Sequence, residues 1–356
     1  MLNLHWIASQ PTPYTSALFS ALAADAGIDL TVHYCSRSQA SHPWRTPPND
    51  SFRWRVFRKV FGIDGRLFRL AALDLKSQFI VGGWNDPTMA AVITIRGLRR
   101  SRFAVWADTP SGTDRPFLVR LVRNPWLAWI FGHATRVLAA GRPASDRLRA
   151  IGCPQEKIVN FPYWVPIPAI ARRVEVRRPV KFVAIGRLEP VKRFDVVIEA
   201  MHLLGQRFGT GTATLRIAGE GSEKTRLLSL VRKYSLDAVV EFTGWLEHDQ
   251  TMTLLTESDV LVHPADWEPY GVVVLEAMAR GKPVIASDGT MAAADRVQNG
   301  INGFIARSGD AADFADRMAA LTQDLEKVKG MGQIARTTAE KWPLELAVSM
   351  LKQVLG

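Results

Sequence analysis

The 356-residue sequence contains only two cysteines, Cys35 and Cys153, which follow no metal-binding or redox spacing. A disulfide-held scaffold is therefore excluded, and a reducing, cytoplasmic setting is expected. No apolar run approaches the ~20 residues that a membrane-spanning helix needs. The first residues, MLNLHWIASQPTPY, lack a basic region and a small-residue cleavage site, so no signal peptide is expected. The seven histidines show no metal-ligand spacing.

Acidic charge is scarce in one half of the chain only. Residues 1–178 contain 25 Lys and Arg against 11 Asp and Glu, a net charge of +14, whereas residues 179–356 contain 20 against 23, a net charge of −3. The first half therefore carries the whole excess and predicts an anionic partner. No zinc-finger, helix-turn-helix or RNP-type pattern accompanies the charge, which argues against nucleic acid.

The densest basic stretch is residues 51–75, where cations alternate with large aromatic side chains. Such alternation suits a peripheral surface on anionic lipid headgroups, with rings in the interface and cations at the phosphates. A solvated basic face whose aromatic residues belong to the core is an equally good interpretation. The cations are Arg53, Arg55, Arg58, Lys59, Arg66 and Arg69.

The length predicts two domains of ~150 residues each. Short apolar strands alternate with amphipathic helices, which indicates an α/β protein with two doubly wound parallel sheets. Expected strands lie at 4–8, 29–34, 79–81, 103–106, 136–139, 181–185, 215–218, 239–242, 260–262 and 283–286. Helices are expected at 16–24, 249–257 and 271–280, with Asp195 and Ser222 capping two more. The expected domains are 1–165 and 180–341, joined by a Pro- and Arg-rich linker at 166–179.

Two loops in the second half carry residues suited to a phosphate-linked ligand. Arg187 and Lys192 follow a strand and can bracket a diphosphate, although a solvated basic loop is the simpler interpretation of either alone. In WEPYGVVVLEA, Glu268 and Glu276 flank a helix start whose N–H groups, at Gly271, Val272 and Val273, favour phosphate. Glu276 can accept hydrogen bonds from two vicinal ribose hydroxyls. The alternative is an ordinary helix with a solvated Glu at each end.

The blocks GRLEPVKRFD, IAGEG, FTGW and VHPADWEPYGVVVLEAMARGKPVIAS, within residues 180–290, occur in an order that resembles the retaining glycosyltransferases of family 4, within glycosyl transferases group 1. The resemblance implies a GT-B fold, with two Rossmann-like domains facing a central cleft. It also implies that 1–165 binds the acceptor, that 180–341 binds a nucleotide-sugar donor, and that the terminal helix at 342–356 crosses back to the first domain.

The resemblance also implies roles for individual residues. Arg187 and Lys192, in the loop that opens with Gly186, would hold the donor diphosphate, Glu268 would contact the donor sugar, and Glu276 would bind the ribose. The N–H groups from Tyr270 to Val273 would bind phosphate or sugar. The nucleobase would lie against Trp245 and Leu246, and Gly219 and Gly221 would form a small turn beside the nucleotide.

Several positions leave more than one interpretation. His263 follows a strand and either lines the donor site or is structural. Trp84 and Asp108 end strands of the first half and are candidates for acceptor binding, although Trp84 fits packing equally well. The pair Asp266 and Glu268 is not taken as a metal site, because two acids one residue apart arise often by chance. No metal and no cofactor are expected.

The sequence thus predicts a retaining, metal-independent hexosyltransferase. The donor is a UDP- or GDP-linked sugar, and the acceptor is a lipid-linked or cell-envelope saccharide at the inner face of the cytoplasmic membrane. The alternatives are another GT-B reaction, such as that of a nucleotide-sugar epimerase or a phosphorylase, and an inactive relative that acts as a membrane-associated partner subunit.

Overall fold

The computed structural model describes residues 1–36, 51–56, 65–109, 117–169 and 175–356. These residues form two compact units, one of Met1–Trp164 with Leu344–Gly356 and one of Val165–Pro343. Two cations of the basic stretch at 51–75, Arg58 and Lys59, lie outside the described residues.

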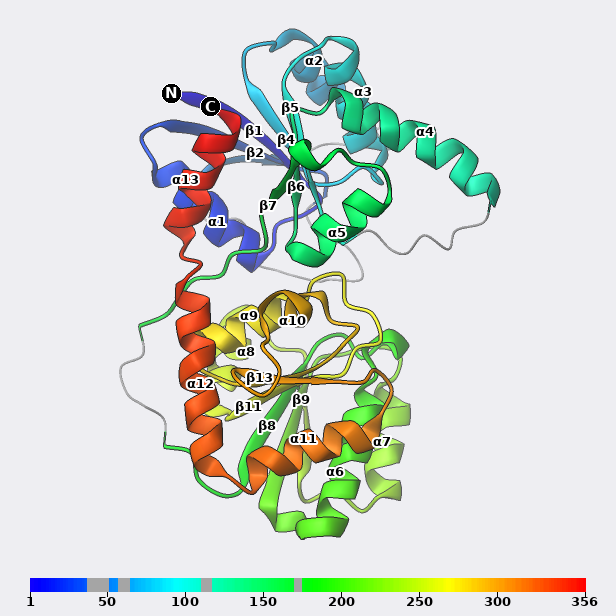
Figure 1. The fold of residues 1–356 in the computed structure, drawn as a ribbon, viewed down its shortest axis with the longest axis vertical. Coiled ribbons are helices and arrows are strands. Elements are labelled where there is room, and N and C mark those ends of the chain that lie inside the picture. The colour runs from blue at the N-terminus through cyan, green and yellow to red at the C-terminus, as the bar shows by residue number, and fades with distance from the viewer. Residues whose placement is uncertain (37–50, 57–64, 110–116, 170–174) are drawn as a thin grey trace. The chain divides into compact units, whose positions relative to one another are not determined.

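The first unit is built on a seven-stranded parallel sheet of order β3-β2-β1-β4-β5-β6-β7. Because helices cover both faces, its inner strands β4 and β5 are buried along their whole length. Figure 1 shows the C-terminal α13 beside α1 of the same unit. The strands are β1 Leu2–Ala8, β2 Ile28–Tyr34, β3 Arg53–Val56, β4 Gln78–Val81, β5 Phe103–Ala107, β6 Arg136–Ala139 and β7 Ile158–Asn160. The helices are α1 Pro13–Ala24, α2 Gly65–Leu73, α3 Pro87–Leu98, α4 Phe117–His133, α5 Arg142–Ala150 and α13 Leu344–Leu355.

The second unit has a six-stranded parallel sheet of order β10-β9-β8-β11-β12-β13. Its core joins apolar strand residues such as Phe182 and Ile217 to the inner faces of α6 and α11, which pack against each other. The strands are β8 Val180–Ile185, β9 Ala213–Ala218, β10 Val240–Gly244, β11 Val260–His263, β12 Val284–Ser287 and β13 Gly303–Ala306. The helices are α6 Phe194–Phe208, α7 Lys224–Lys233, α8 His248–Glu257, α9 Val272–Ala279, α10 Met291–Arg296, α11 Ala311–Thr322 and α12 Leu325–Glu340.

The structure confirms the predicted α/β class with two doubly wound parallel sheets, but two helix starts were predicted wrongly. Asp195 does not cap α6; the helix begins at Phe194, after Arg193 in the left-handed conformation, and Asp195 forms an ion pair with Arg193. Ser222 does not cap α7, which begins at Lys224, because the Ser222 hydroxyl donates to Glu189 instead. In both cases a contact with another side chain replaces the local cap.

Both sheets contain a point at which the strand order reverses. In the second unit it lies between β8 and β11, which are hydrogen-bonded neighbours, and in the first unit between β1 and β4. Doubly wound sheets bind ligands beyond the carboxyl ends of the two strands at this switch point. The loops after β8 and β11 are therefore the first place to look for a site in the second unit.

Candidate functional site

The loop after β8 lies against the loop after β9, and glycines allow this contact. Gly186 N–H donates to the Ala218 carbonyl at 3.0 Å, and Leu188 N–H donates to the Glu220 carbonyl at 2.9 Å. A Cβ at Gly219 would overlap the Gly186 carbonyl oxygen, and one at Gly221 would overlap the Leu188 carbonyl. The two predicted glycines of the small turn thus let the segment carrying Arg187 pack closely on its neighbour.

Gly221→Ala is expected to lower the free energy of unfolding by about 1–3 kcal/mol, because the backbone must shift to admit the methyl group. The matched control is Gly330→Ala in α12, where a Cβ meets nothing within 4 Å. That change is expected to raise the free energy of unfolding by about 1 kcal/mol, through helix propensity. Equal effects of the two changes in urea denaturation would contradict the packing argument.

Lys192, Glu268 and His263 come together at the switch point. The Lys192 ammonium forms a close ion pair with Glu268 Oε2, and both side chains are largely buried. His263, the last residue of β11, places Nε2 3.5 Å from the same Glu268 oxygen. Burial alone would raise the pKa of Glu268, but the adjacent His263 ring and the Lys192 charge outweigh it and lower that pKa to about 2. Glu268 is therefore a carboxylate throughout the neutral range.

Arg187 supplies a second cation on the same loop as Lys192. Its side chain is half-buried, and it makes no hydrogen bond or ion pair with the residues that the structure describes. A guanidinium held at a loop without a protein partner is suited to a fork-like contact with phosphate oxygens.

The N-terminus of α9 presents backbone donors next to Glu268. Gly271 caps the helix at a φ of 95°, a conformation that favours glycine, and a Cβ there would lie 3.0 Å from Glu268 Cγ. The N–H groups of Gly271, Val272 and Val273 donate to no described residue, so they are available to an anion. The Tyr270 side chain, in contrast, is buried and its hydroxyl donates to Asp295 Oδ2 at 3.2 Å, so this hydroxyl is already engaged within the protein.

Glu276 lies further along α9, with only 9% of its surface exposed. His248, the first residue of α8, places Nδ1 3.9 Å from Glu276 Oε1. Burial raises the pKa of Glu276 to about 7, and the charge of Arg280 offsets only part of that rise. Half-buried Trp245 and Leu246 lie between β10 and α8, on the chain segment that leads to His248.

A clamp that the sequence did not predict ties the Lys192 loop to the Glu268 loop. Arg193 Nη1 donates to both oxygens of Asp266 at 3.1 Å, and Arg193 Nε donates to Asp195 Oδ1 at 3.2 Å. Asp266 N–H donates to the Val191 carbonyl at 2.9 Å, and Asp266 Oδ1 accepts from the Ser308 hydroxyl at 2.6 Å.

The backbone conformation of Arg193 is unfavourable and is maintained by these side-chain contacts. Arg193 has φ 50° and ψ 42°, a left-handed conformation that disfavours a side chain. Its ion pairs compensate for that conformation. Asp266 is thus a partner of Arg193, a contact that its position two residues before Glu268 did not indicate.

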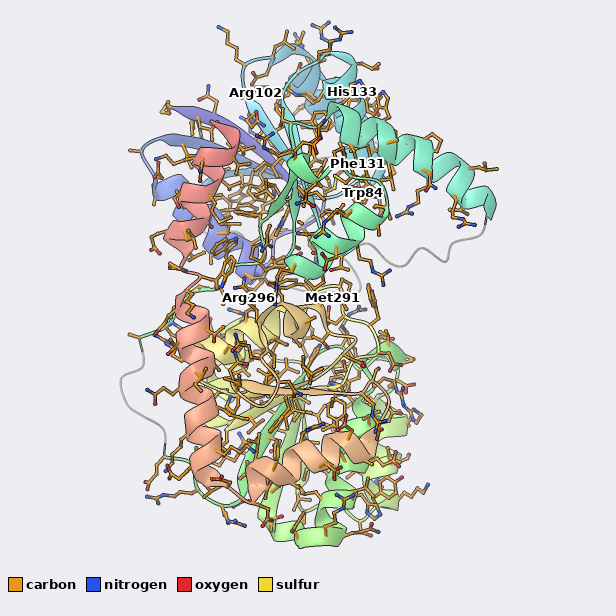
Figure 2. All side chains as sticks on the ribbon, in the orientation of Figure 1. Trp84, Arg102, Phe131, His133, Met291 and Arg296 are labelled. Carbon is orange, nitrogen blue, oxygen red and sulfur yellow. The ribbon has the colours of Figure 1, made fainter. Side chains whose placement is uncertain are left out.

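The two acceptor candidates lie at the carboxyl edge of the first sheet. Trp84 follows β4, at that unit's switch point, and packs edge-to-face against Phe131 of α4 with ring centroids 6.2 Å apart; Figure 2 labels both residues. Asp108 directly follows β5 and is exposed. Among the described residues, no group of three His, Cys, Asp or Glu side chains is arranged to hold a metal ion.

Two Rossmann-like units in one chain define the GT-B class of protein. Anabaena HepE, solved in complex with UDP and glucose, matches 100% of this chain and 99% of its own with a TM-score of 0.77 at 16% identity. The apo form of the lipopolysaccharide outer core galactosyltransferase WaaB matches 99% of both chains with a TM-score of 0.74 at 15% identity. These likenesses over the whole chain establish the fold.

Residues 170–338 match the model of the family glycosyl transferases group 1. The match covers just under half of the chain and agrees with the group 1 resemblance seen in the motifs. A glycogen synthase of Mycobacterium tuberculosis is 34% identical over 169 residues, which are 48% of this chain and 40% of the relative. The amylovoran biosynthesis glycosyltransferase AmsK of Erwinia amylovora is 27% identical over 236 residues, 64% of this chain and 57% of the relative.

The chain spans about half the length of the curated relatives that it matches. Within the described ranges, none of the helices has the length and apolar character that crossing a membrane requires.

Proposed function

We propose that this protein is a retaining, metal-independent glycosyltransferase. It transfers a hexose-type sugar from a UDP- or GDP-linked donor to a hydroxyl group of a lipid-linked or cell-envelope saccharide. The observation that carries the proposal is the grouping of Arg187, Lys192 and the free N–H groups of α9 around the switch point of the second sheet. That grouping suits a diphosphate, and Glu276 on the same helix suits the attached ribose.

In the proposed reaction, the bond between the anomeric carbon and the diphosphate oxygen breaks, and its electron pair leaves with the diphosphate. The acceptor oxygen attacks from the same face, and its proton passes to the departing phosphate oxygen. Arg187, Lys192 and the N-terminus of α9 stabilise the negative charge that develops there, which is why no metal is proposed. Glu268, fixed by Lys192, orients the donor sugar through its hydroxyl groups.

The acceptor is proposed to bind the domain at residues 1–165, with Trp84 and Asp108 as contacts, and the donor to bind the domain at 180–341. The net charge of +14 over residues 1–178 supports an acceptor at an anionic surface, the inner face of the cytoplasmic membrane. One relative, AmsK, carries a name from amylovoran biosynthesis, and a polysaccharide acceptor fits that likeness.

An inactive partner subunit is the alternative from another class. The presence of Arg187, Lys192, Glu268 and Glu276 in one unit argues against it. Incubation with UDP- and GDP-hexoses distinguishes an active transferase from an inactive subunit, because an active donor site slowly releases nucleoside diphosphate even without acceptor. A thermal-shift screen of UDP, GDP, ADP and their sugars identifies the donor. No stabilisation by any nucleotide would refute a nucleotide-sugar site of any kind, including that of an epimerase.

The Arg193 clamp yields a prediction that separates positioning from stability. Arg193→Gly relieves the left-handed backbone and removes the ion pairs to Asp195 and Asp266. The two effects on unfolding oppose each other, each on the order of 1 kcal/mol, so the melting temperature is expected to change little. We expect kcat to fall about tenfold, because the Lys192 and Glu268 loops lose their common anchor.

Ser235→Gly is the matched control, since Ser235 is an exposed residue of the same unit with φ 55°. It should raise the melting temperature slightly and leave kcat unchanged. Arg193→Lys should recover part of the lost turnover. If Arg193→Gly turned over at the rate of the wild type, the clamp would have no part in positioning.

A further inference from the structure

Three of the most exposed leucines in the described chain lie together at the amino edge of the first sheet. Leu73 at the end of α2 is 65% exposed, Leu75 is 47% exposed, and Leu98 at the end of α3 is 72% exposed. Residues 73–77 lead into β4 and residues 98–102 lead into β5, so both segments lie where these strands begin. Figure 1 shows α2 and α3 as neighbours, in agreement with the contacts between them.

One buried arginine fixes both segments in place. The Arg96 guanidinium is fully buried and lies 4.2 Å from the centroid of the Phe79 ring. It donates to the carbonyls of Ser77 and Arg102 at 2.8 Å, and also to that of Asp74. Arg96 therefore holds in place the two backbone segments that carry the leucines. Other side chains already occupy the positions that face the core, so the packing of these segments directs the leucines toward solvent.

The leucines are surrounded by positive charge. Residues 66–76 and 98–102 together contain six Lys and Arg and a single acidic residue, Asp74. Asp74 is already engaged, because Oδ1 accepts from the N–H groups of Lys76 and Ser77, and Oδ2 lies 3.3 Å from His5 Nε2. On α2, Arg69 is exposed one turn before Leu73 and so extends the same face.

We propose that this surface binds an anionic lipid bilayer. We call it the amino-edge patch: Leu73, Leu75, Lys76, Leu98, Arg99 and Arg102. The six residues are all exposed, and Figure 2 labels Arg102 within the first unit. Leucines held among cations match a membrane interface, where apolar side chains enter the acyl boundary while guanidinium and ammonium groups meet lipid phosphates.

The chemistry of the patch favours a bilayer over other anionic partners. A nucleic acid would engage the cations through its phosphates and leave the three leucines in water. An acidic protein segment would need a continuous apolar strip, whereas here cations separate the leucines. A bilayer takes up both kinds of side chain at once, since its headgroups are anionic and its interior is apolar.

The inference deepens the membrane part of the proposed function and is independent of the transfer reaction. Trp84 and Asp108 follow strands β4 and β5, so they lie at the carboxyl edge, whereas the patch lies at the amino edge of the same strands. Changes in the patch should therefore leave the donor and acceptor residues intact. Binding to membranes and turnover with soluble substrates can be measured separately.

The test is flotation of the full chain with vesicles of phosphatidylcholine, alone or with about a third of phosphatidylglycerol. We expect binding to the anionic vesicles only, lost at high salt. The double variant Leu73→Ser and Leu98→Ser should weaken binding at least about tenfold, or about 1.4 kcal/mol. Its control is Ile301→Ser with Ile334→Ser, two exposed apolar residues of the second unit that should leave binding unchanged. Both double variants should release nucleoside diphosphate from the donor at the wild-type rate.

A labelling experiment tests the insertion of the patch into the membrane with only one of its three leucines replaced. Cys35 and Cys153 are both buried, so Leu98→Cys can be labelled selectively with an environment-sensitive dye. Its emission should shift to the blue on anionic vesicles, while a dye on Ile301→Cys should not respond. The proposal is overturned by no flotation at low salt, by equal loss in the two double variants, by an unshifted dye at Leu98→Cys, or by salt-sensitive binding to RNA but not to vesicles. Each of these results would leave the proposed transfer reaction standing.

Discussion

Lys192→Ala is expected to lower kcat for donor turnover by about a hundred- to a thousandfold. In the proposed mechanism the Lys192 charge matters most when the diphosphate departs, because negative charge is then greatest on the oxygen that it faces. The affinity for the intact donor should fall less than kcat, since a charge that develops late is felt mainly in the transition state. Steady-state kinetics with the identified nucleotide sugar measures both quantities.

The ion pair with Glu268 adds a second consequence of the same change. Without Lys192, the largely buried Glu268 carboxylate loses its closest positive charge, and its pKa should rise from its present value of about 2. The matched control is Lys224→Ala, because Lys224 also pairs with a glutamate, Glu220, but on the surface of the same unit. A Lys192 variant that keeps the wild-type kcat would contradict the proposal that Lys192 stabilises the departing diphosphate. A comparable loss in the Lys224 variant would show that the effect is not local.

Glu276→Gln is expected to weaken the binding of nucleoside diphosphate by about ten- to a hundredfold, because a neutral amide replaces the carboxylate that we propose accepts hydrogen bonds from two ribose hydroxyls. The wild-type affinity should itself fall as the pH drops through about 7, the value to which burial raises the pKa of Glu276. The variant should lack this pH dependence. Calorimetric titration at several pH values measures both, and pH-independent wild-type affinity would contradict the ribose role.

Glu276→Gln is expected to weaken nucleotide binding but to increase the stability of the free protein. Glu276 has a folded-state pKa of about 7 against a reference value of 4.5, so the native state binds more protons between these two pH values. Stability should therefore fall as pH rises through that window, and the full cost, roughly 3 kcal/mol, is present above about 7. Glu276→Gln should remove this cost and raise the melting temperature at pH 8. A lower melting temperature at that pH would show that the carboxylate stabilises the free protein.

Much of the fold was predictable because the strands are short apolar runs buried on both faces. Strands such as β11, and β8 apart from the exposed Lys181, appear in the sequence as short apolar stretches followed by glycine or polar loops. Lys192 and His263 were each placed after such a strand and Glu268 just before a helix, and the structure brings these three together. The three missed strands, β3, β7 and β13, have only three or four residues each, too short for a periodic signal.

Contacts between distant segments account for the two wrongly predicted helix starts. Arg193 takes a left-handed backbone that no local propensity favours, and its partner Asp266 is 73 residues further along the chain. Ser222 looked like a helix cap, but its hydroxyl bonds to Glu189, which belongs to a neighbouring loop. The amino-edge patch was predicted only in part, because the basic stretch at 51–75 includes Leu73 and Leu75 but not Leu98. The sequence does not show that Leu98 lies near these two leucines, and only the packing around Arg96 shows that the two segments meet.

We propose that the loops after β8 and β11 form a donor site that cleaves a nucleotide sugar. The most direct test is the release of nucleoside diphosphate from UDP- and GDP-hexoses by the purified full chain, compared with the Arg187→Ala, Lys192→Ala double variant. We expect release from one class of donor by the wild type and at least about a thousandfold less by the double variant. Equal release by the two proteins, or none from any donor, would contradict it.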